Sequence, residues 1–182
     1  MKTIAPKPKY FLLAACMLLI SAQISPSNEY KVKAVFLFNF VQFVEWPSKA
    51  FAEKDSPLVI GILGENPFGT YLHETVYHEK LTGHPLVVKQ YENVKEVSNC
   101  QILFVNPDNI GELGSIAEEL KQQHVLIVGE ATEAFMKRGG MIGFFLQDGR
   151  IRMKINLESI KEADLKVSSK LLRVADMYNN KQ

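Results

Sequence analysis

Cysteine is scarce in this sequence, and its scarcity excludes a disulfide framework. The 182 residues contain two cysteines, Cys16 and Cys100, and we expect Cys16 to be lost with an N-terminal segment. Small disulfide-stabilised domains need several paired cysteines. An apolar core must therefore stabilise the chain. Cys100, which lies beside the apolar run 102–105, is expected to be a buried, unreactive thiol; a disulfide between two copies of the chain is the alternative.

The chain also lacks an excess of charge of either sign. It has 21 basic and 20 acidic residues, a formal net charge of +1, and removal of Lys2, Lys7 and Lys9 would leave 1 − 3 = −2. Domains that bind nucleic acid concentrate basic residues on one face or along one helix. We therefore expect no nucleic-acid partner.

Nucleotide-binding motifs are missing as well. The segment Gly64–Thr70 follows an apolar run and has glycines five residues apart, which superficially resembles a phosphate-binding loop. Such a loop needs lysine after the second glycine to meet the phosphate charge, and this chain has Thr70 there. The dinucleotide pattern G-x-G-x-x-G is absent too. The sequence predicts no nucleotide cofactor.

No constellation of catalytic or metal-binding residues appears. His73 and His78 are five residues apart, a spacing that does not place them on one helix face, and no cysteine or carboxylate cluster joins them. There is no G-x-S-x-G nucleophile motif, and Ser168-Ser169-Lys170 is not S-x-x-K. We expect the protein not to be an enzyme and to hold neither a metal nor a cofactor.

The N-terminus, in contrast, carries a clear export pattern. Three lysines precede the apolar run 10–20, which is too short to span a bilayer as a mature helix, and small residues follow it at Ser21-Ala22. This pattern predicts a signal peptide over residues 1–22 and a periplasmic protein. A retained N-terminal anchor is one alternative. Lipidation of Cys16 in the lipobox-like sequence 13–16 is another, disfavoured because the apolar run continues beyond Cys16.

A short linker over residues 23–28 is expected to lead into a single domain over residues 29–179. Its first segment, 29–45, predicts a helix that is apolar on nearly all sides. Either it is a core helix between two layers, or it offers one face to a partner or a second copy. One predicted stripe contains Val32, Val35, Phe36, Phe40 and Phe43, and the other Leu37, Phe38, Val41 and Val44. Phe38 and Val41 are the candidate partner surface.

The following segments alternate between short aliphatic strands and helices. Such alternation is typical of an α/β fold whose mostly parallel sheet is covered on both faces. The predicted strands are 58–63, 85–88, 102–105 and 125–128, with helices ending at Tyr77, over 110–123 and over 132–138. A hairpin over 141–155 turns at Asp148-Gly149, and a terminal helix is expected over Ser168–Tyr178.

Polar residues gather in the loops after these strands, where open α/β sheets bind ligands. The candidate ligand loops contain Glu65, Asn66, Asn106, Asp108, Glu130 and Thr132. Asn, Asp and Thr are also the usual helix caps and turn formers, which is the alternative explanation for them.

Several segments, in order along nearly the whole chain after the export signal, are similar to the YfiR-like family of periplasmic proteins. They are YKVKAVFLFNF with EWP (30–40 and 45–47), IGILGENPFG (60–69), CQILFV (100–105), GGMIGF (139–144), and RIRMKINL with LKVSSKLL (150–157 and 165–172). The last block is the most specific.

The resemblance implies a Rossmann-like three-layer α/β sandwich, often dimeric, without enzymatic activity. The type member represses an inner-membrane diguanylate cyclase and is itself sequestered by an outer-membrane lipoprotein. This chain is accordingly expected to act by protein–protein contact and to lower cyclic di-GMP, with effects on biofilm. The type member's disulfides cannot be carried over, because Cys100 would have no mature partner. A periplasmic small-ligand-binding or sensor domain, or a transport accessory, is the alternative function.

Overall fold

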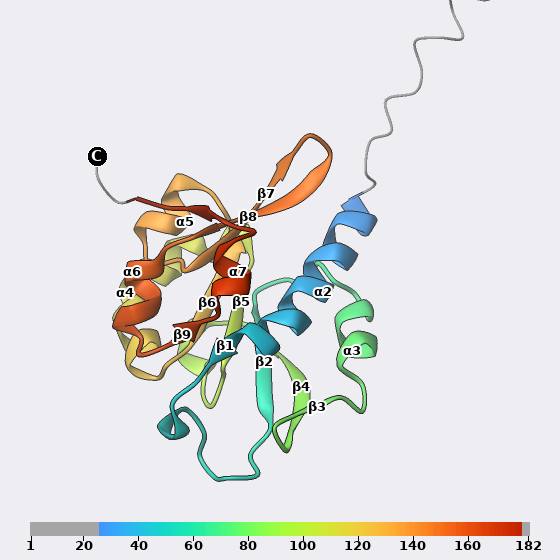
Figure 1. Cartoon of the computed structure of the whole chain (residues 1–182), viewed down its shortest axis with the longest axis vertical. Helices are drawn as coiled ribbons and strands as arrows, with labels where there is room; N and C mark the ends of the chain where they lie inside the picture. Colours follow the sequence, from blue (N-terminus) through green and yellow to red (C-terminus); the bar gives the residue numbers. More distant parts are fainter. Residues whose placement is uncertain (1–25, 180–182) are drawn as a thin grey trace, which may run out of the picture.

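The aliphatic runs of the sequence form the buried strands of an eight-stranded sheet (Figure 1). The computed structural model describes residues 26–179. The predicted signal peptide, its predicted cleavage site and Cys16 lie outside these residues. Every residue is buried in β2 (Leu58–Leu63) and β5 (Ile102–Val105). Together with β4 (His84–Tyr91), β6 (Leu126–Glu130) and β7 (Ile142–Gln147), they make the parallel centre, in the order β7-β6-β5-β2-β4.

Three further strands complete both edges of the sheet. On one side β3 (Lys80–Leu81) pairs antiparallel with the start of β4. On the other, β8 (Arg150–Ile155) pairs antiparallel with β7, and β10 (Asp176–Met177) pairs parallel with β8. The β7–β8 turn has positive φ at Asp148 (50°) and Gly149 (69°), as a two-residue hairpin turn requires. The predicted hairpin is confirmed.

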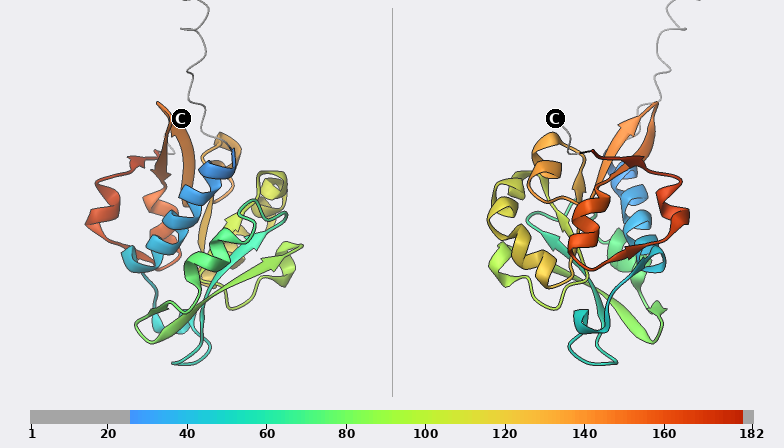
Figure 2. Two further views of the ribbon diagram at one scale, coloured as in Figure 1. Left: turned by 90° about the vertical axis from the view of Figure 1, so that its right-hand side faces the viewer. Right: turned by 60° about the vertical axis from the view of Figure 1, so that its left-hand side comes forward.

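Helices cover both faces of the sheet, which gives the three layers (Figure 2). On one face lie α2 (Pro26–Phe43) and α3 (Tyr71–Val76), and on the other α4 (Ile110–Gln122) and α5 (Glu133–Lys137), with α6 (Leu157–Glu162) beside α4. A two-stranded ladder joins β1 (Val44–Glu45) to β9 (Lys166–Val167). Short helical turns are η2 (Ser48–Ala50), η3 (Val94–Glu96), η4 (Pro107–Asn109) and α7 (Ser169–Leu172). The predicted mostly parallel α/β sandwich is confirmed.

The buried side of the first helix coincides with neither of the two stripes predicted from its spacing. It begins at Pro26, within the expected linker, and ends at Phe43. Its buried apolar side chains are Ala34, Leu37, Phe40 and Val41, whereas Val32 and Val35 are exposed. The buried side of α2 thus takes Phe40 from one predicted stripe and Leu37 and Val41 from the other. A helix that is apolar on several sides does not reveal from its own sequence which side the sheet will cover.

The C-terminus differs from its expected helix for a tertiary reason. Helix α7 ends at Leu172 instead of continuing to Tyr178. The next residues form β10, where Asp176 and Met177 lie opposite Lys154 and Ile155 of β8, and the backbone N–H of Tyr178 donates to Ile155 at 2.8 Å. The exposed edge of β8 supplies these hydrogen bonds, and they override the local helical pattern.

Candidate functional site

The predicted ligand loops after β2 and β5 contact each other. The sheet order reverses between these two strands, so their carboxyl ends lie at the position where α/β sheets often bind ligands. Here the side-chain amide of Asn106 donates to the backbone carbonyl of Glu65 at 2.8 Å. Asn66 accepts from the backbone N–H of Phe68 at 2.9 Å. The Asn106 amide therefore joins the two loops, and Asn66 shapes the turn of the loop after β2.

The remaining loop residues have separate roles. Asn106 also accepts from the backbone N–H of Asp108, whose own side chain is exposed, and Thr132 caps α5 by accepting from Phe135 at 3.1 Å. Glu65 is exposed. Turn formation and helix capping, the alternative drawn from the sequence, thus describe Asn66, Asn106 and Thr132. The side chain of Glu130 interacts with α2 instead.

Glu130 takes part in a buried ion cluster that fastens α2 to the end of β6. Lys33, with 1% of its side chain exposed, lies 2.5 Å from Glu130 and 2.6 Å from Glu29. The ring of Tyr30 covers its ammonium group, 4.5 Å from the ring centroid. Burial alone lowers the pKa of Lys33, but hydrogen bonds to Glu130 and Glu29 outweigh it, so the pKa is raised above its ordinary value. The ammonium group stays charged at neutral pH.

Sequence reasoning missed the role of Lys33. The available signal was a lysine within an otherwise apolar helix, four residues after Glu29, which is the favourable order for a helical ion pair. The partner on β6 lies 97 residues away in the sequence. Only the packing of α2 on the sheet brings the two together.

The face of α2 turned away from the sheet carries an apolar stripe. Val32 and Val35 are 40% and 39% exposed, and one helical turn further Phe36 is half-buried against Phe144 of β7, with 5.8 Å between ring centroids. Such positions are usually polar on a helix that packs one side onto a sheet. This stripe is a candidate contact surface.

An apolar groove continues this stripe toward α7. Its volume is about 200 Å³, and it lies between the α2 side chains Phe36, Asn39 and Phe43 and the segment Lys170–Val174. Val174, at its margin, is 58% exposed. We call the combined region the α2–α7 surface: Val32, Val35, Phe36, Asn39, Phe43, Leu171 and Val174.

The two residues predicted as the partner surface lie elsewhere on α2. Val41 is 2% exposed and belongs to the core, so the prediction that it contacts a partner is wrong. Phe38 is half-buried and packs against the core. The idea of a partner-facing side of α2 stays a prediction, and it now rests on the stripe next to α7.

Cys100 is a free, buried thiol, as predicted. Burial raises its pKa to about 12, and its Sγ lies 3.0 Å from the carbonyl oxygen of Ile102. Within residues 26–179 there is no group of three or more potential metal ligands, and no helix with the length and apolarity to cross a bilayer.

Comparison with protein families relates most of the chain to a described family. A family model described as YfiR/HmsC-like matches residues 30–176. This range begins in α2, ends in β10 and includes both Lys33 and the α2–α7 surface. No curated protein matches the chain.

Proposed function

The chain belongs to the YfiR/HmsC-like family, and from this premise we propose that it is a periplasmic regulatory protein that acts by protein–protein contact, without catalysis. Its partner is a membrane-bound signalling protein of the diguanylate cyclase type. Holding the periplasmic region of the cyclase in an inactive state lowers cyclic di-GMP. An outer-membrane lipoprotein that sequesters the regulator would relieve this repression.

The exposed apolar stripe of α2 carries the proposal. Two valines with about 40% exposure adjoin the apolar groove beside α7. Burying apolar surface of this kind is the main favourable contribution to protein association. Several side chains of the expected ligand loops, Asn66, Asn106 and Thr132, are already used in turns and caps, so those loops do not favour the ligand-binding alternative.

The Lys33 cluster supports the proposal by making α2 a rigid platform. The Lys33–Glu130 ion pair joins α2 to β6, and the Tyr30–Phe68 contact (5.6 Å between ring centroids) joins it to the loop before α3. The Lys33–Glu29 pair lies within the helix itself. A preorganised surface loses less conformational entropy when a partner binds. A second copy of the chain could use the same surface, which would couple dimerisation to repression.

The test measures, by biolayer interferometry, binding of the exported protein to the periplasmic segment of a membrane-bound diguanylate cyclase from the same cell. Val35→Asp and Val174→Asp each place a charge on the α2–α7 surface. We expect each to weaken binding by at least about ten-fold, as for central apolar contact residues.

Tyr77→Asp is the matched control. Tyr77 is also a large exposed side chain, at 71%, but it follows α3 and lies outside the α2–α7 surface. It should bind with wild-type affinity. In cells, deletion of the gene should raise cyclic di-GMP, and Val35→Asp should fail to restore the lower level. Wild-type binding by both surface variants would overturn the proposed surface, and unchanged cyclic di-GMP after deletion would overturn the proposed regulation.

A further inference from the structure

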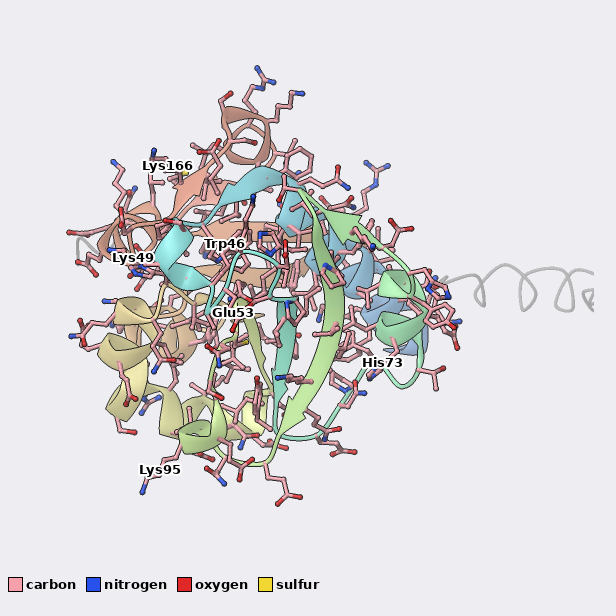
Figure 3. All side chains as sticks on the ribbon, turned by 90° about the horizontal axis from the view of Figure 1, so that it is seen from below. Trp46, Lys49, Glu53, His73, Lys95 and Lys166 are labelled. Atoms are coloured by element: carbon pink, nitrogen blue, oxygen red, sulfur yellow. The ribbon has the colours of Figure 1, made fainter. Side chains whose placement is uncertain are left out.

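A larger cavity lies at the opposite end of the sheet from the predicted ligand loops. It has a volume of about 710 Å³ and opens between the end of α2, the loop after η2 and the β3–β4 hairpin. Its apolar walls are Val41, Val44, Trp46, Phe51, Leu58 and Leu81. Figure 3 looks onto this end of the molecule, with Trp46 and Glu53 labelled near each other. Cavities of this size and apolar character are typical of small-molecule sites.

The aromatic walls are held in place by contacts with other residues of the protein. The indole N–H of Trp46 donates to the backbone carbonyl of Gln101 at 3.1 Å. Phe51 stacks on His84 with 4.2 Å between ring centroids and 18° between the planes. A site whose walls are fixed beforehand loses little entropy when a ligand binds.

One polar side chain of the cavity, His84, is placed as a hydrogen-bond acceptor. Nδ1 of His84 lies 2.6 Å from the backbone carbonyl of Ser56. Because a carbonyl oxygen can only accept, Nδ1 carries a proton, and in this tautomer Nε2 is a hydrogen-bond acceptor. This assignment makes His84 a partner for a donor on a ligand.

The charged side chains at the rim also favour a ligand that donates hydrogen bonds. Glu45 and Glu53 line the cavity, and neither forms an ion pair with another residue of the described chain. Lys54 is the cation among the lining residues. The rim therefore carries two negative charges and one positive charge, which favours a ligand with a positive charge and N–H donors.

We propose that this cavity binds an amine with an apolar carbon skeleton. The skeleton packs against the walls that include Trp46 and Leu81, and the ammonium group lies at the rim among Glu45, Glu53 and Nε2 of His84. This inference is independent of the proposed regulatory function, because the α2–α7 surface and the cavity share no side chain.

Trp46 supplies a direct readout, because it is the single tryptophan of the chain. The probe is 2-phenylethylamine, and its charge-reversed counterpart is 3-phenylpropanoate. With the exported protein at neutral pH, the amine should change Trp46 fluorescence saturably. The carboxylate, with a similar apolar body, should bind at least about ten-fold more weakly, since it meets two rim carboxylates.

Three variants separate the charge and the cavity from the rest of the protein. Glu53→Gln should weaken amine binding about three-fold, the scale of one exposed ion pair. Ala52→Phe, at an exposed wall position, should fill the mouth and abolish the saturable signal. Glu74→Gln, an exposed carboxylate on α3 that does not line the cavity, should bind as the wild type does.

Equal affinity for the amine and the carboxylate would overturn the assigned ligand class. So would unchanged amine affinity in Glu53→Gln. A saturable signal that persists in Ala52→Phe, or no fluorescence response to the amine at millimolar concentration, would overturn the site itself.

Discussion

Nζ of Lys33 on α2 lies 2.5 Å from Oε1 of Glu130 at the carboxyl end of β6. The contact joins the first helix to a strand near the middle of the sheet. The side chain of Lys33 is buried between the two. It orients Lys33 inward and thereby leaves Val32 and Val35, its neighbours on the helix, facing outward. The pair lies on the same side of α2 as the buried Leu37 and Phe40, so ion pair and apolar contacts favour the same rotation of the helix.

Replacing Lys33 with Met should destabilise the domain by about 2 kcal/mol. The carboxylates of Glu29 and Glu130 would face each other without a cation, although their partial exposure keeps the cost below the 3–5 kcal/mol roughly expected for a fully buried broken pair. Urea unfolding followed by circular dichroism measures the change. Lys137→Met breaks an exposed helical pair with Glu133 and should cost below about 0.5 kcal/mol. Equal stability of the Lys33 variant and wild type would contradict the assigned role.

The same ion pairs predict that the free energy of unfolding falls at alkaline pH. The folded-state pKa of Lys33 is raised above its ordinary value of 10.5, so the unfolded state loses this proton first. The stability that the charged Lys33 contributes is fully present below its unfolded-state pKa. It is lost as the pH rises through the higher pKa that Lys33 has in the folded state. The difference in unfolding free energy between wild type and Lys33→Met should shrink above about pH 10.5. A difference that stays constant up to about pH 12 would count against the ion pairs.

Val41→Asp and Val35→Asp should have opposite effects on folding. Val41 is buried, and an unpaired carboxylate there costs several kcal/mol, enough to unfold a domain of ordinary stability. Val35 is 39% exposed, so its variant should stay within about 1 kcal/mol of wild type. Circular dichroism with thermal melting distinguishes the two. A folded Val41→Asp protein would mean that this side of α2 is not core.

Cys100 should react slowly with thiol reagents. Burial raises its pKa to about 12, so the reactive thiolate is rare at neutral pH, and the reagent must also reach a closed interior. Ellman's reagent should label the native protein far more slowly than the protein in guanidinium chloride. A fast native reaction, or a covalent dimer on a non-reducing gel, would show that the thiol is accessible.

Gly64→Ala should destabilise the loop after β2 by roughly 1–3 kcal/mol. Gly64 has φ +87°, and an added Cβ would lie 2.0 Å from Oδ1 of Asn109. Gly111→Ala is the control with the opposite sign, because Gly111 lies in α4 with no neighbouring atom within 4 Å of the added Cβ. That change should stabilise by up to about 0.5–1 kcal/mol. Chemical denaturation measures both; a neutral Gly64→Ala would show that the loop can rearrange.

The export pattern predicts a mature N-terminus at Gln23. Mass spectrometry of protein from a periplasmic fraction checks this, and a lipid-modified Cys16 would support the lipoprotein alternative instead. Recovery of the intact chain from the cytoplasm would refute export.

Much of the fold could be predicted because its signals are local. Strands β2, β5 and β6 are short aliphatic runs. Thr132 is the N-terminal cap of α5, and its side-chain oxygen accepts a hydrogen bond from the backbone N–H of Phe135. The β7–β8 turn needs positive φ at two adjacent residues, which Asp148-Gly149 tolerates. Each of these depends on neighbouring residues in the chain, so pattern reasoning succeeds.

The candidate site could not be predicted in the same way. Val41 and Val35 are chemically identical and lie on one apolar helix, yet one is core and the other exposed. The walls of the amine cavity likewise come from separate segments, since Trp46 follows α2 and Leu81 belongs to β3. Spacing along one helix contains no information about which strands and loops will pack around it.

The sequence alone thus determined the alternating elements, the parallel sheet and the buried thiol, because hydrophobic period and turn chemistry act over a few residues. Tertiary structure decided the rotation of α2 and the end of the chain. Lys33 turns inward because Glu130 lies there to satisfy its charge, and residues 176–177 become a strand because the edge of β8 offers unpaired backbone groups. Both outcomes depend on partners at least twenty residues away, which no local pattern records.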